Sequence, residues 1–138
     1  MATEPIFVFD ACALIALLED EPGAKVVEDL LQEPANRCLV HAVSVCEIYY
    51  DLCRRGDVED AETLERLLSE FGLEIVEALP SDLWRIAGKI KAEWRRVSLA
   101  DCFALALAIR ETGTLVTSDH HELDALAKAE LCRIQFIR

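Results

Sequence analysis

The stretch from residue 6 to residue 18 constrains the fold of this chain more than any other. Four apolar residues, 6–9, stand between a proline and Asp10, and such a run is typical of a β-strand buried on both faces. Residues 11–18 follow without a charged side chain, which predicts a helix that is apolar all round and lies in the core. An ionised carboxylate at this junction is costly unless it caps the helix or binds a cation. The stretch itself leaves both roles for Asp10 open.

Length and composition narrow the class of protein. The 138 residues suit one domain spanning 1–138, and the longest apolar run, 11–18, is far shorter than a bilayer span of ~18 residues or more. The first residues lack the basic and apolar segments of a signal peptide, so we expect a cytoplasmic protein with no membrane contact. The cysteines at 12, 38, 46, 53, 102 and 132 include no CxxC pair, and four of them lie in apolar helical patterns. We therefore expect free, buried thiols.

The charge balance restricts the partners of the chain. Twenty-six acidic residues against fourteen basic ones give a net charge of −12, which opposes indiscriminate binding to polyanions. An acidic protein can still cleave nucleic acid if bound divalent cations invert the local field, or it can await a basic partner. Arg85, Lys89 and Arg96 line one side of a helix predicted over residues 82–96. We favour a solvated outer face for them over a rail for a phosphate backbone.

Strand and helix patterns alternate from end to end, without a repeat or a linker that would divide the chain. The expected strands are 6–9, 38–40, 73–77, 114–117 and 131–137, and the expected helices are 11–18, 24–32, 44–55, 58–71, 82–96, 99–109 and a short one around 123–127. This alternation predicts a parallel α/β sheet covered by helices on both faces. In such sheets a ligand binds at the carboxyl ends of the strands, where the strand order reverses.

Four carboxylates are expected at that edge. Asp10 and Asp119 directly follow buried strands, and Glu47 and Asp101 fall in the first turns of predicted helices. Each has a simpler interpretation as a helix cap, because Asp is a good N-cap and Glu47 and Asp101 each stand three residues after a serine, in a capping-box pattern.

Helix capping explains each of these acids taken singly. It does not explain why four of them are expected at the same edge of the sheet. Two unit charges ~5 Å apart repel by roughly 3 kcal/mol at an effective dielectric of 20, and a divalent cation removes that repulsion. A site of carboxylates suits Mg²⁺ or Mn²⁺, whereas Zn²⁺ favours imidazole or thiolate ligands. His120 and His121 lie in the same region, but loop histidines are more often exposed than bound to metal.

Four motifs in order carry a resemblance to a known family. The segments FDACALIALL, SVCEIYYDL, SLADCFALALAI and LVTSDHHEL resemble those of the PIN-domain ribonucleases, and especially the VapC toxins of VapBC toxin-antitoxin modules. The resemblance runs from Ile6 to the last strand and implies a three-layer α/β/α sandwich with a central, mostly parallel sheet of four to five strands. Asp10, Glu47, Asp101 and Asp119 match the family's acidic quartet, which holds one or two Mg²⁺ or Mn²⁺ ions. Thr117 falls where relatives often place a polar residue.

The resemblance implies an endoribonuclease that depends on Mg²⁺ or Mn²⁺ and acts as a toxin on RNA. It also implies a homodimer and a cognate antitoxin whose basic segment enters the acidic pocket. Three alternatives stay open at this point. The pocket could serve protein binding without catalysis. A receiver domain would need an aspartate after its third strand and a lysine after a later one, which 73–78 and 131–138 do not clearly provide, and a haloacid-dehalogenase-like phosphatase would need an aspartate where Cys12 stands.

Overall fold

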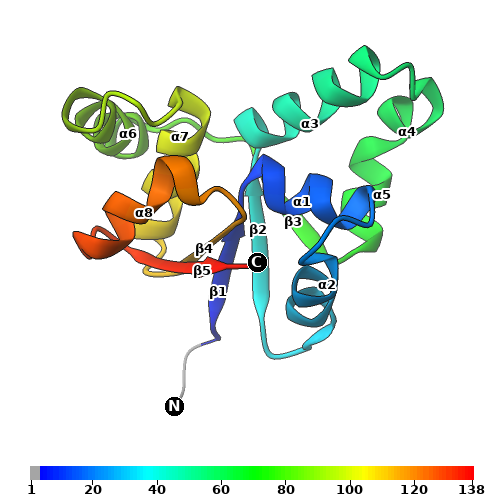
Figure 1. Ribbon diagram of the computed structural model, residues 1–138, viewed down its shortest axis with the longest axis horizontal. Helices are drawn as coiled ribbons and strands as arrows, with labels where there is room; N and C mark the ends of the chain where they lie inside the picture. Colours follow the sequence, from blue (N-terminus) through cyan, green and yellow to red (C-terminus); the bar gives the residue numbers. More distant parts are fainter. Residues whose placement is uncertain (1–3) are drawn as a thin grey trace.

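The computed structural model describes residues 4–138 and contains one five-stranded sheet. Its strands are β1 (Ile6–Phe9), β2 (Arg37–His41), β3 (Leu73–Val76), β4 (Thr114–Thr117) and β5 (Arg133–Phe136). They lie in the order β3-β2-β1-β4-β5, and every neighbouring pair is parallel (Figure 1). The expected parallel sheet is confirmed. Receiver domains have the order 2-1-3-4-5, so that alternative is wrong.

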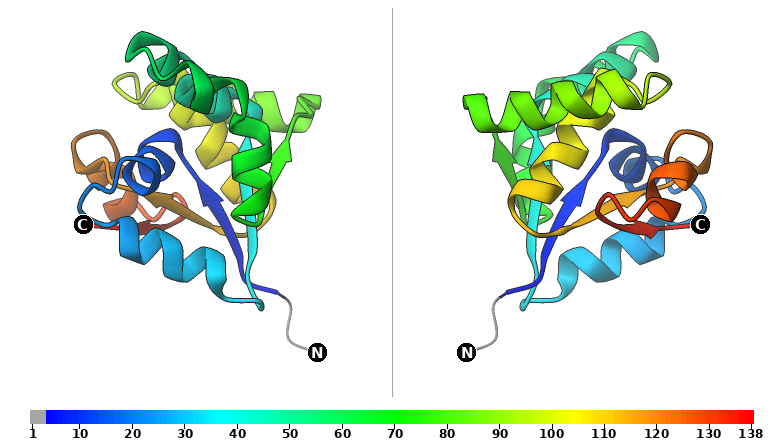
Figure 2. Two further views of the ribbon diagram at one scale, coloured as in Figure 1. Left: turned by 90° about the vertical axis from the view of Figure 1, so that its right-hand side faces the viewer. Right: turned by 90° about the vertical axis from the view of Figure 1, so that its left-hand side faces the viewer.

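Helices cover both faces of the sheet. One set comprises α1 (Ala11–Leu18), α2 (Ala24–Gln32), α3 (Ala42–Arg54), α4 (Val58–Glu62) and α5 (Leu64–Glu70); the other comprises α6 (Ser81–Glu93), α7 (Leu99–Arg110) and α8 (His120–Lys128). Figures 1 and 2 show the two sets on opposite sides of the strands. Adjacent strand residues divide between two cores: Val8 packs with α6 to α8, and Phe9 packs with α1 to α5. This alternation produces the three-layer α/β/α sandwich.

Two predicted helices have different bounds in the structure. The helix expected over 58–71 is divided at Thr63, whose hydroxyl donates to the Glu59 carbonyl oxygen at 3.0 Å, and Phe71 beyond it is 36% exposed rather than inward. The helix expected over 82–96 ends at Glu93, so Arg96 lies on the loop between α6 and α7. The predicted line of Arg85, Lys89 and Arg96 on one helix is therefore wrong.

The start of α3 and the cysteines also correct the sequence interpretation. The N-cap of α3 is His41, whose Nδ1 accepts a hydrogen bond from the Val43 amide at 3.1 Å, and not Ser44. All six thiols are free, as expected, but Cys46 and Cys53 are exposed because they lie on the side of α3 that faces solvent. Within residues 4–138, no helix combines the length and the apolar character that crossing a membrane requires.

Candidate metal centre

The carboxyl ends of β1 and β4 meet where the strand order reverses. From β1 the chain proceeds to β2 on one side, and β4 lies on the other side of β1 and pairs onward with β5. The Asp10 amide donates to the Val116 carbonyl oxygen at 3.1 Å, which extends the contact between the two strands by one residue. This junction is the place where open parallel sheets bind ligands, and both Asp10 and Asp119 follow its strands.

Asp10 is fully buried and uses only one of its two carboxylate oxygens. Its Oδ1 accepts hydrogen bonds from the Ala13 amide at 2.9 Å and from the Cys12 thiol at 3.1 Å, which makes Asp10 the N-cap of α1. Its Oδ2 is buried without a hydrogen-bond partner. Burial raises the pKa of Asp10 to about 6, against the opposite effect of polar contacts with Thr117, Ala13 and Cys12. One oxygen therefore caps the helix and the other is left for a ligand.

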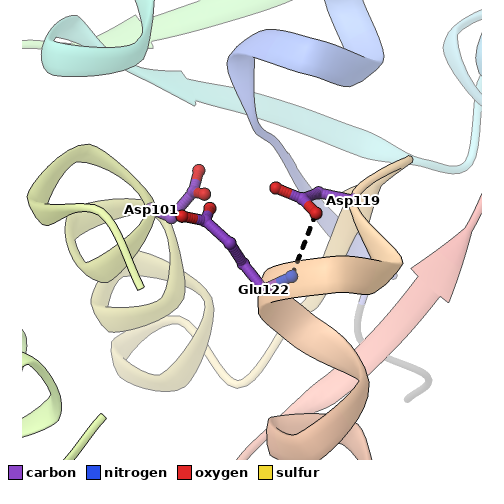
Figure 3. A group of neighbouring side chains, drawn as sticks. All are labelled: Asp101, Asp119 and Glu122. Atoms are coloured by element: carbon purple, nitrogen blue, oxygen red, sulfur yellow. Dashed lines mark hydrogen bonds between the residues drawn. The ribbon is translucent and has the colours of Figure 1, made fainter. Parts of the chain in front are cut away.

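Asp119 is anchored on both its backbone and its side chain. Its amide donates to Oγ1 of the buried Thr117 at 3.0 Å, and its Oδ1 accepts a hydrogen bond from the Glu122 amide at 3.0 Å, as the N-cap of α8 (Figure 3). Asp101, Asp119 and Glu122 each direct a carboxylate oxygen toward the others, with these atoms all within 4.8 Å of one another (Figure 3). The predicted neighbourhood of Asp101 and Asp119 is thus found, with a third acid between them.

Asp101 and Glu122 influence each other's protonation. The Ser98 hydroxyl accepts a hydrogen bond from the Asp101 amide at 3.1 Å, so Ser98 caps α7 as expected and fixes Asp101 in its first turn. Burial raises the pKa of Asp101 to about 6, while its hydrogen bond with Glu122 lowers it. The same hydrogen bond, followed by burial, raises the pKa of Glu122 to about 8. Without a cation, the two carboxylates therefore share a proton near neutral pH.

Glu47 reaches this region from α3. The helix begins at Ala42, so Glu47 lies in its second turn rather than the first, and the capping-box interpretation is wrong. Burial raises the pKa of Glu47, and the negative charge of Glu122 raises it further. Asp101 is in turn affected by the charges of both Glu47 and Asp10. The four predicted acids thus come within electrostatic reach of one shared centre.

Glu122 is the acidic residue that the sequence interpretation missed. The short helix was expected around 123–127, but α8 already begins at His120, which places Glu122 in its first turn. The available signal was the spacing Asp119-x-x-Glu122, which is the same N-cap-to-third-residue spacing as Ser98-x-x-Asp101. His120 is engaged elsewhere: its ring nitrogens contact Asp124 at 2.8 Å and the Arg138 carbonyl oxygen at 2.7 Å.

The donor set fits a hard divalent cation. Asp101, Asp119 and Glu122 lie together, and the charges of Asp10 and Glu47 act on Asp101. The adjacent Cys12 thiol supplies no thiolate, because burial raises its pKa to about 12. The N-termini of α1, α7 and α8 point their partial positive charge at these acids, which offsets part of the repulsion between them. The buried Oδ2 of Asp10 still lacks a partner, and a cation would supply one.

The comparisons with known proteins place this arrangement in a family. The family model of the PIN domain matches residues 7–129. Ribonuclease VapC42 of Mycobacterium tuberculosis is 28% identical over 108 residues, covering 73% of this chain and 81% of its own sequence. VapC ribonuclease Mb2780c of Mycobacterium bovis has the same identity and coverage.

Solved structures share the fold at lower sequence identity. VapBC2 from Rickettsia felis, bound to a DNA fragment from the promoter, has a TM-score of 0.72 at 18% identity, covering 95% of this chain and 98% of the other. A toxin-antitoxin complex from Klebsiella pneumoniae has a TM-score of 0.70 at 17% identity, with 95% and 97% covered. Because the family model spans most of the sequence, the chain belongs to the PIN-domain family.

Proposed function

We propose that this protein is an endoribonuclease that depends on Mg²⁺ or Mn²⁺ and hydrolyses RNA phosphodiester bonds. Membership of the PIN-domain family and the relatives named as ribonucleases support the reaction class. The observation that carries the metal dependence is the unpartnered Oδ2 of Asp10. A buried acceptor without a hydrogen bond costs about 1–3 kcal/mol, and more when it is charged, so its retention beside further acids supports a ligand for it.

The residues proposed to hold the cation are Asp10, Glu47, Asp101 and Asp119, with Glu122 as a fifth carboxylate. The Ala13 amide holds the carboxylate of Asp10, and the Ser98 hydroxyl holds the backbone amide of Asp101. When bound, the cation would neutralise charge on the phosphodiester and lower the pKa of the attacking water.

Cys12 is not a suitable nucleophile at this position. The raised pKa of Cys12, about 12, keeps its thiol protonated at neutral pH, and a protonated thiol is a poor nucleophile. Water is therefore the proposed nucleophile, and the role of the side chains is to bind and orient. This favours direct hydrolysis over a covalent intermediate.

We further propose that the nuclease is the toxin of a toxin-antitoxin module in the cytoplasm. The solved structures of similar fold include VapBC and toxin-antitoxin complexes, which supports a cognate antitoxin as partner. The net charge of −12 favours a basic segment of that antitoxin, with an arginine entering the acidic centre. We expect a homodimer, as the sequence resemblance implies.

Cleavage of mixed RNA with Mn²⁺, with and without EDTA, tests the proposal. The wild-type protein should cleave only with the metal, and Asp101→Asn should abolish cleavage. Asp60→Asn, the same chemical change on the exposed surface of α4, is the matched control and should keep full activity. Undiminished metal-dependent cleavage by Asp101→Asn would contradict the assignment. Absence of cleavage by the folded wild-type protein would favour the alternative, a protein-binding module without catalysis.

A further inference from the structure

The positive charge of this acidic chain is concentrated beside the acidic centre. Half of its fourteen basic residues form ion pairs with acids, namely Lys25, Arg37, Arg54, Arg55, Arg66, Arg110 and Arg138. Of the other seven, five lie within residues 85–96, where Glu93 is the only acid. Among residues 4–138, no carboxylate lies within ion-pair distance of these five side chains.

A short loop presents two of these charges in a fixed conformation. Lys91 lies in the last turn of α6. Its ammonium group donates to two carbonyl oxygens of the loop that follows, those of Arg95 at 2.9 Å and of Val97 at 2.7 Å. The Val97 amide donates to the Trp94 carbonyl oxygen at 3.0 Å, and the Val97 side chain is buried. The loop backbone is therefore pinned to the protein while the side chains of Arg95 and Arg96 are exposed. Lys91 is used for this support, which leaves the two arginines free.

This loop forms one wall of a groove that leads to the acidic centre. A cavity of about 250 Å³ is lined by Arg95 and Arg96 on the loop and by His121 and Glu122 on α8. Glu122 also belongs to the carboxylate cluster with Asp101 and Asp119. The cavity and the carboxylate cluster thus share Glu122. Glu93 is the other acid in the cavity lining, and the two arginines lie on the loop that follows it.

We propose that Arg95 and Arg96 form a subsite for an RNA phosphate that neighbours the scissile one. The inference rests on the proposed ribonuclease function and specifies how a chain of net charge −12 holds its polyanionic substrate. Guanidinium groups bind phosphate oxygens with two parallel hydrogen bonds, and unpaired ones give up no internal ion pair to do so. RNA offers one phosphate to the cation and another to the arginines, whereas an acidic peptide would meet carboxylates beside them. The repeating phosphates of RNA therefore match the succession of the metal centre and the two arginines.

The groove differs from the basic rail along a helix, which the sequence favoured less than a solvated outer face. Arg85 and Lys89 lie on α6, and the Arg85 guanidinium stacks over the exposed Trp84 ring, 4.9 Å from its centroid. Neither residue lines the groove. They carry the same two charges within the same short segment, and so provide a matched comparison for Arg95 and Arg96.

RNA binding by charge-neutralised variants tests the subsite. The double variants Arg95→Gln/Arg96→Gln and Arg85→Gln/Lys89→Gln would be prepared in an Asp101→Asn background, which keeps the RNA intact. Fluorescence anisotropy with a labelled single-stranded RNA of random sequence in Mg²⁺ measures the affinity at several salt concentrations. We expect the Arg95/Arg96 variant to bind about ten-fold more weakly, and the slope of log K against log salt to decrease by about 0.7, the value for one neutralised phosphate of a single strand.

The control variant should change affinity by less than about two-fold, because Arg85 and Lys89 do not line the groove and act on the RNA only through charge screened by salt. In the otherwise wild-type protein, the Arg95/Arg96 variant should cleave more slowly at low RNA concentration and equally fast at saturation. Equal losses in the two double variants would indicate general electrostatics and overturn the subsite, as would unchanged binding by the Arg95/Arg96 variant. If the Arg95/Arg96 variant lost more affinity for poly-glutamate than for RNA, the loop would instead be assigned to binding an acidic protein.

The outcomes separate the subsite from the function on which it rests. If the wild-type protein cleaves RNA with Mn²⁺ and the Arg95/Arg96 variant does so equally well at every RNA concentration, only the subsite fails. If the folded wild-type protein neither binds nor cleaves RNA, the proposed function fails and the subsite fails with it. Matching thermal midpoints of the variants and the wild type establish that exposed substitutions left the fold intact.

Discussion

The innermost carboxylate of the centre and the cluster of three outer ones, Asp101, Asp119 and Glu122, are positioned in different ways. Asp10 is 0% exposed and joins β1 directly to α1, so a single stretch of chain fixes it in the core. Asp101, Asp119 and Glu122 are half-buried and come from the first turns of α7 and α8, which only the folded sheet brings together. The inner acid is held by backbone and core, and the outer acids are held largely by one another.

This difference assigns different physical tasks to the two groups. Asp10 keeps an unpartnered oxygen in a fixed position, so it offers a cation a ligand that needs no rearrangement. The outer group shares a proton between Asp101 and Glu122, so its charge changes when a cation displaces that proton. Asp10 should therefore be required for activity, as Asp101 is, whereas Glu122 should govern how tightly and at what pH the centre binds metal.

Replacement of the inner acid should lower activity as strongly as Asp101→Asn does, and this is the largest effect expected. Asp10→Asn removes a proposed ligand while its remaining amide oxygen can still cap α1, and we expect cleavage with Mn²⁺ to fall about 1000-fold, the equivalent of several kcal/mol of lost charge stabilisation. Asp10→Asn/Asp101→Asn should lose no more than either single variant, because both acids would act through the same ion. If the rate of the double variant fell by the product of the two single losses, the inner and outer acids would act independently.

The stability of the metal-free protein should fall as the pH rises from about 4 to about 8. The pKa values of Asp10 and Asp101 are raised to about 6 and that of Glu122 to about 8, so the folded state holds protons that the unfolded state releases. The stabilisation is complete at a pH below the pKa values that these carboxyl groups have in the unfolded chain. It is lost as the pH rises through their pKa values in the folded protein. Thermal unfolding with EDTA measures it, and excess Mn²⁺ should reverse the loss at pH 8.

Asp10→Asn isolates the contribution of the inner acid to that pH dependence. A shift from 3.8 to about 6 corresponds to about 3 kcal/mol at pH 8, so the variant should be more stable than the wild type by roughly this amount there. The difference should close toward pH 4. Parallel stability curves for the two proteins would contradict the raised pKa of Asp10.

The sequence predicted those parts of the molecule that depend on local pattern. The apolar run before Asp10 and the apolar helix containing Asp101 identified two core elements, and the alternation of elements predicted a parallel sheet whose edge gathers the acids. Both elements are buried as expected because a parallel sheet covered on two faces needs continuous apolar sequence. The inner acid was accordingly recognised at its correct position, before α1.

Features that depend on contacts between distant segments could not be predicted from the sequence. Glu122 joins the centre only because α7 and α8 approach each other, and its helix starts earlier than its apolar residues suggest. The loop carrying Arg95 and Arg96 forms because Lys91 binds two loop carbonyl oxygens, a contact that does not affect hydrophobic periodicity. The complete outer group and the loop carrying Arg95 and Arg96 could therefore be recognised only in the structure.

Glu122→Gln should weaken metal binding while leaving activity measurable at high metal concentration. The amide of residue 122, not its side chain, donates to Asp119, so α8 keeps its N-cap. We expect the affinity for Mn²⁺ to fall about ten-fold, at the lower end of the range for residues that support metal ligands. Isothermal titration calorimetry measures it, with Glu130→Gln, an exposed position just beyond α8, as the control. An unchanged affinity would remove Glu122 from the centre.

Thr117→Val should produce the smallest effect and test the connection between the two groups. The Thr117 hydroxyl lies 3.5 Å from the Cys12 sulfur on the inner side and accepts a hydrogen bond from the Asp119 amide at 3.0 Å on the outer side. Valine keeps the shape of threonine but leaves that part-buried amide unpaired, so we expect a loss of about 1 kcal/mol in stability, whereas Thr114→Val at the start of β4 should cost less. Amide hydrogen exchange should become faster at Asp119 and stay unchanged at Ala13, whose amide is bound by Asp10. Equal acceleration at both amides would mean that the inner acid depends on Thr117 as much as the outer acid does, and the two groups would then be one.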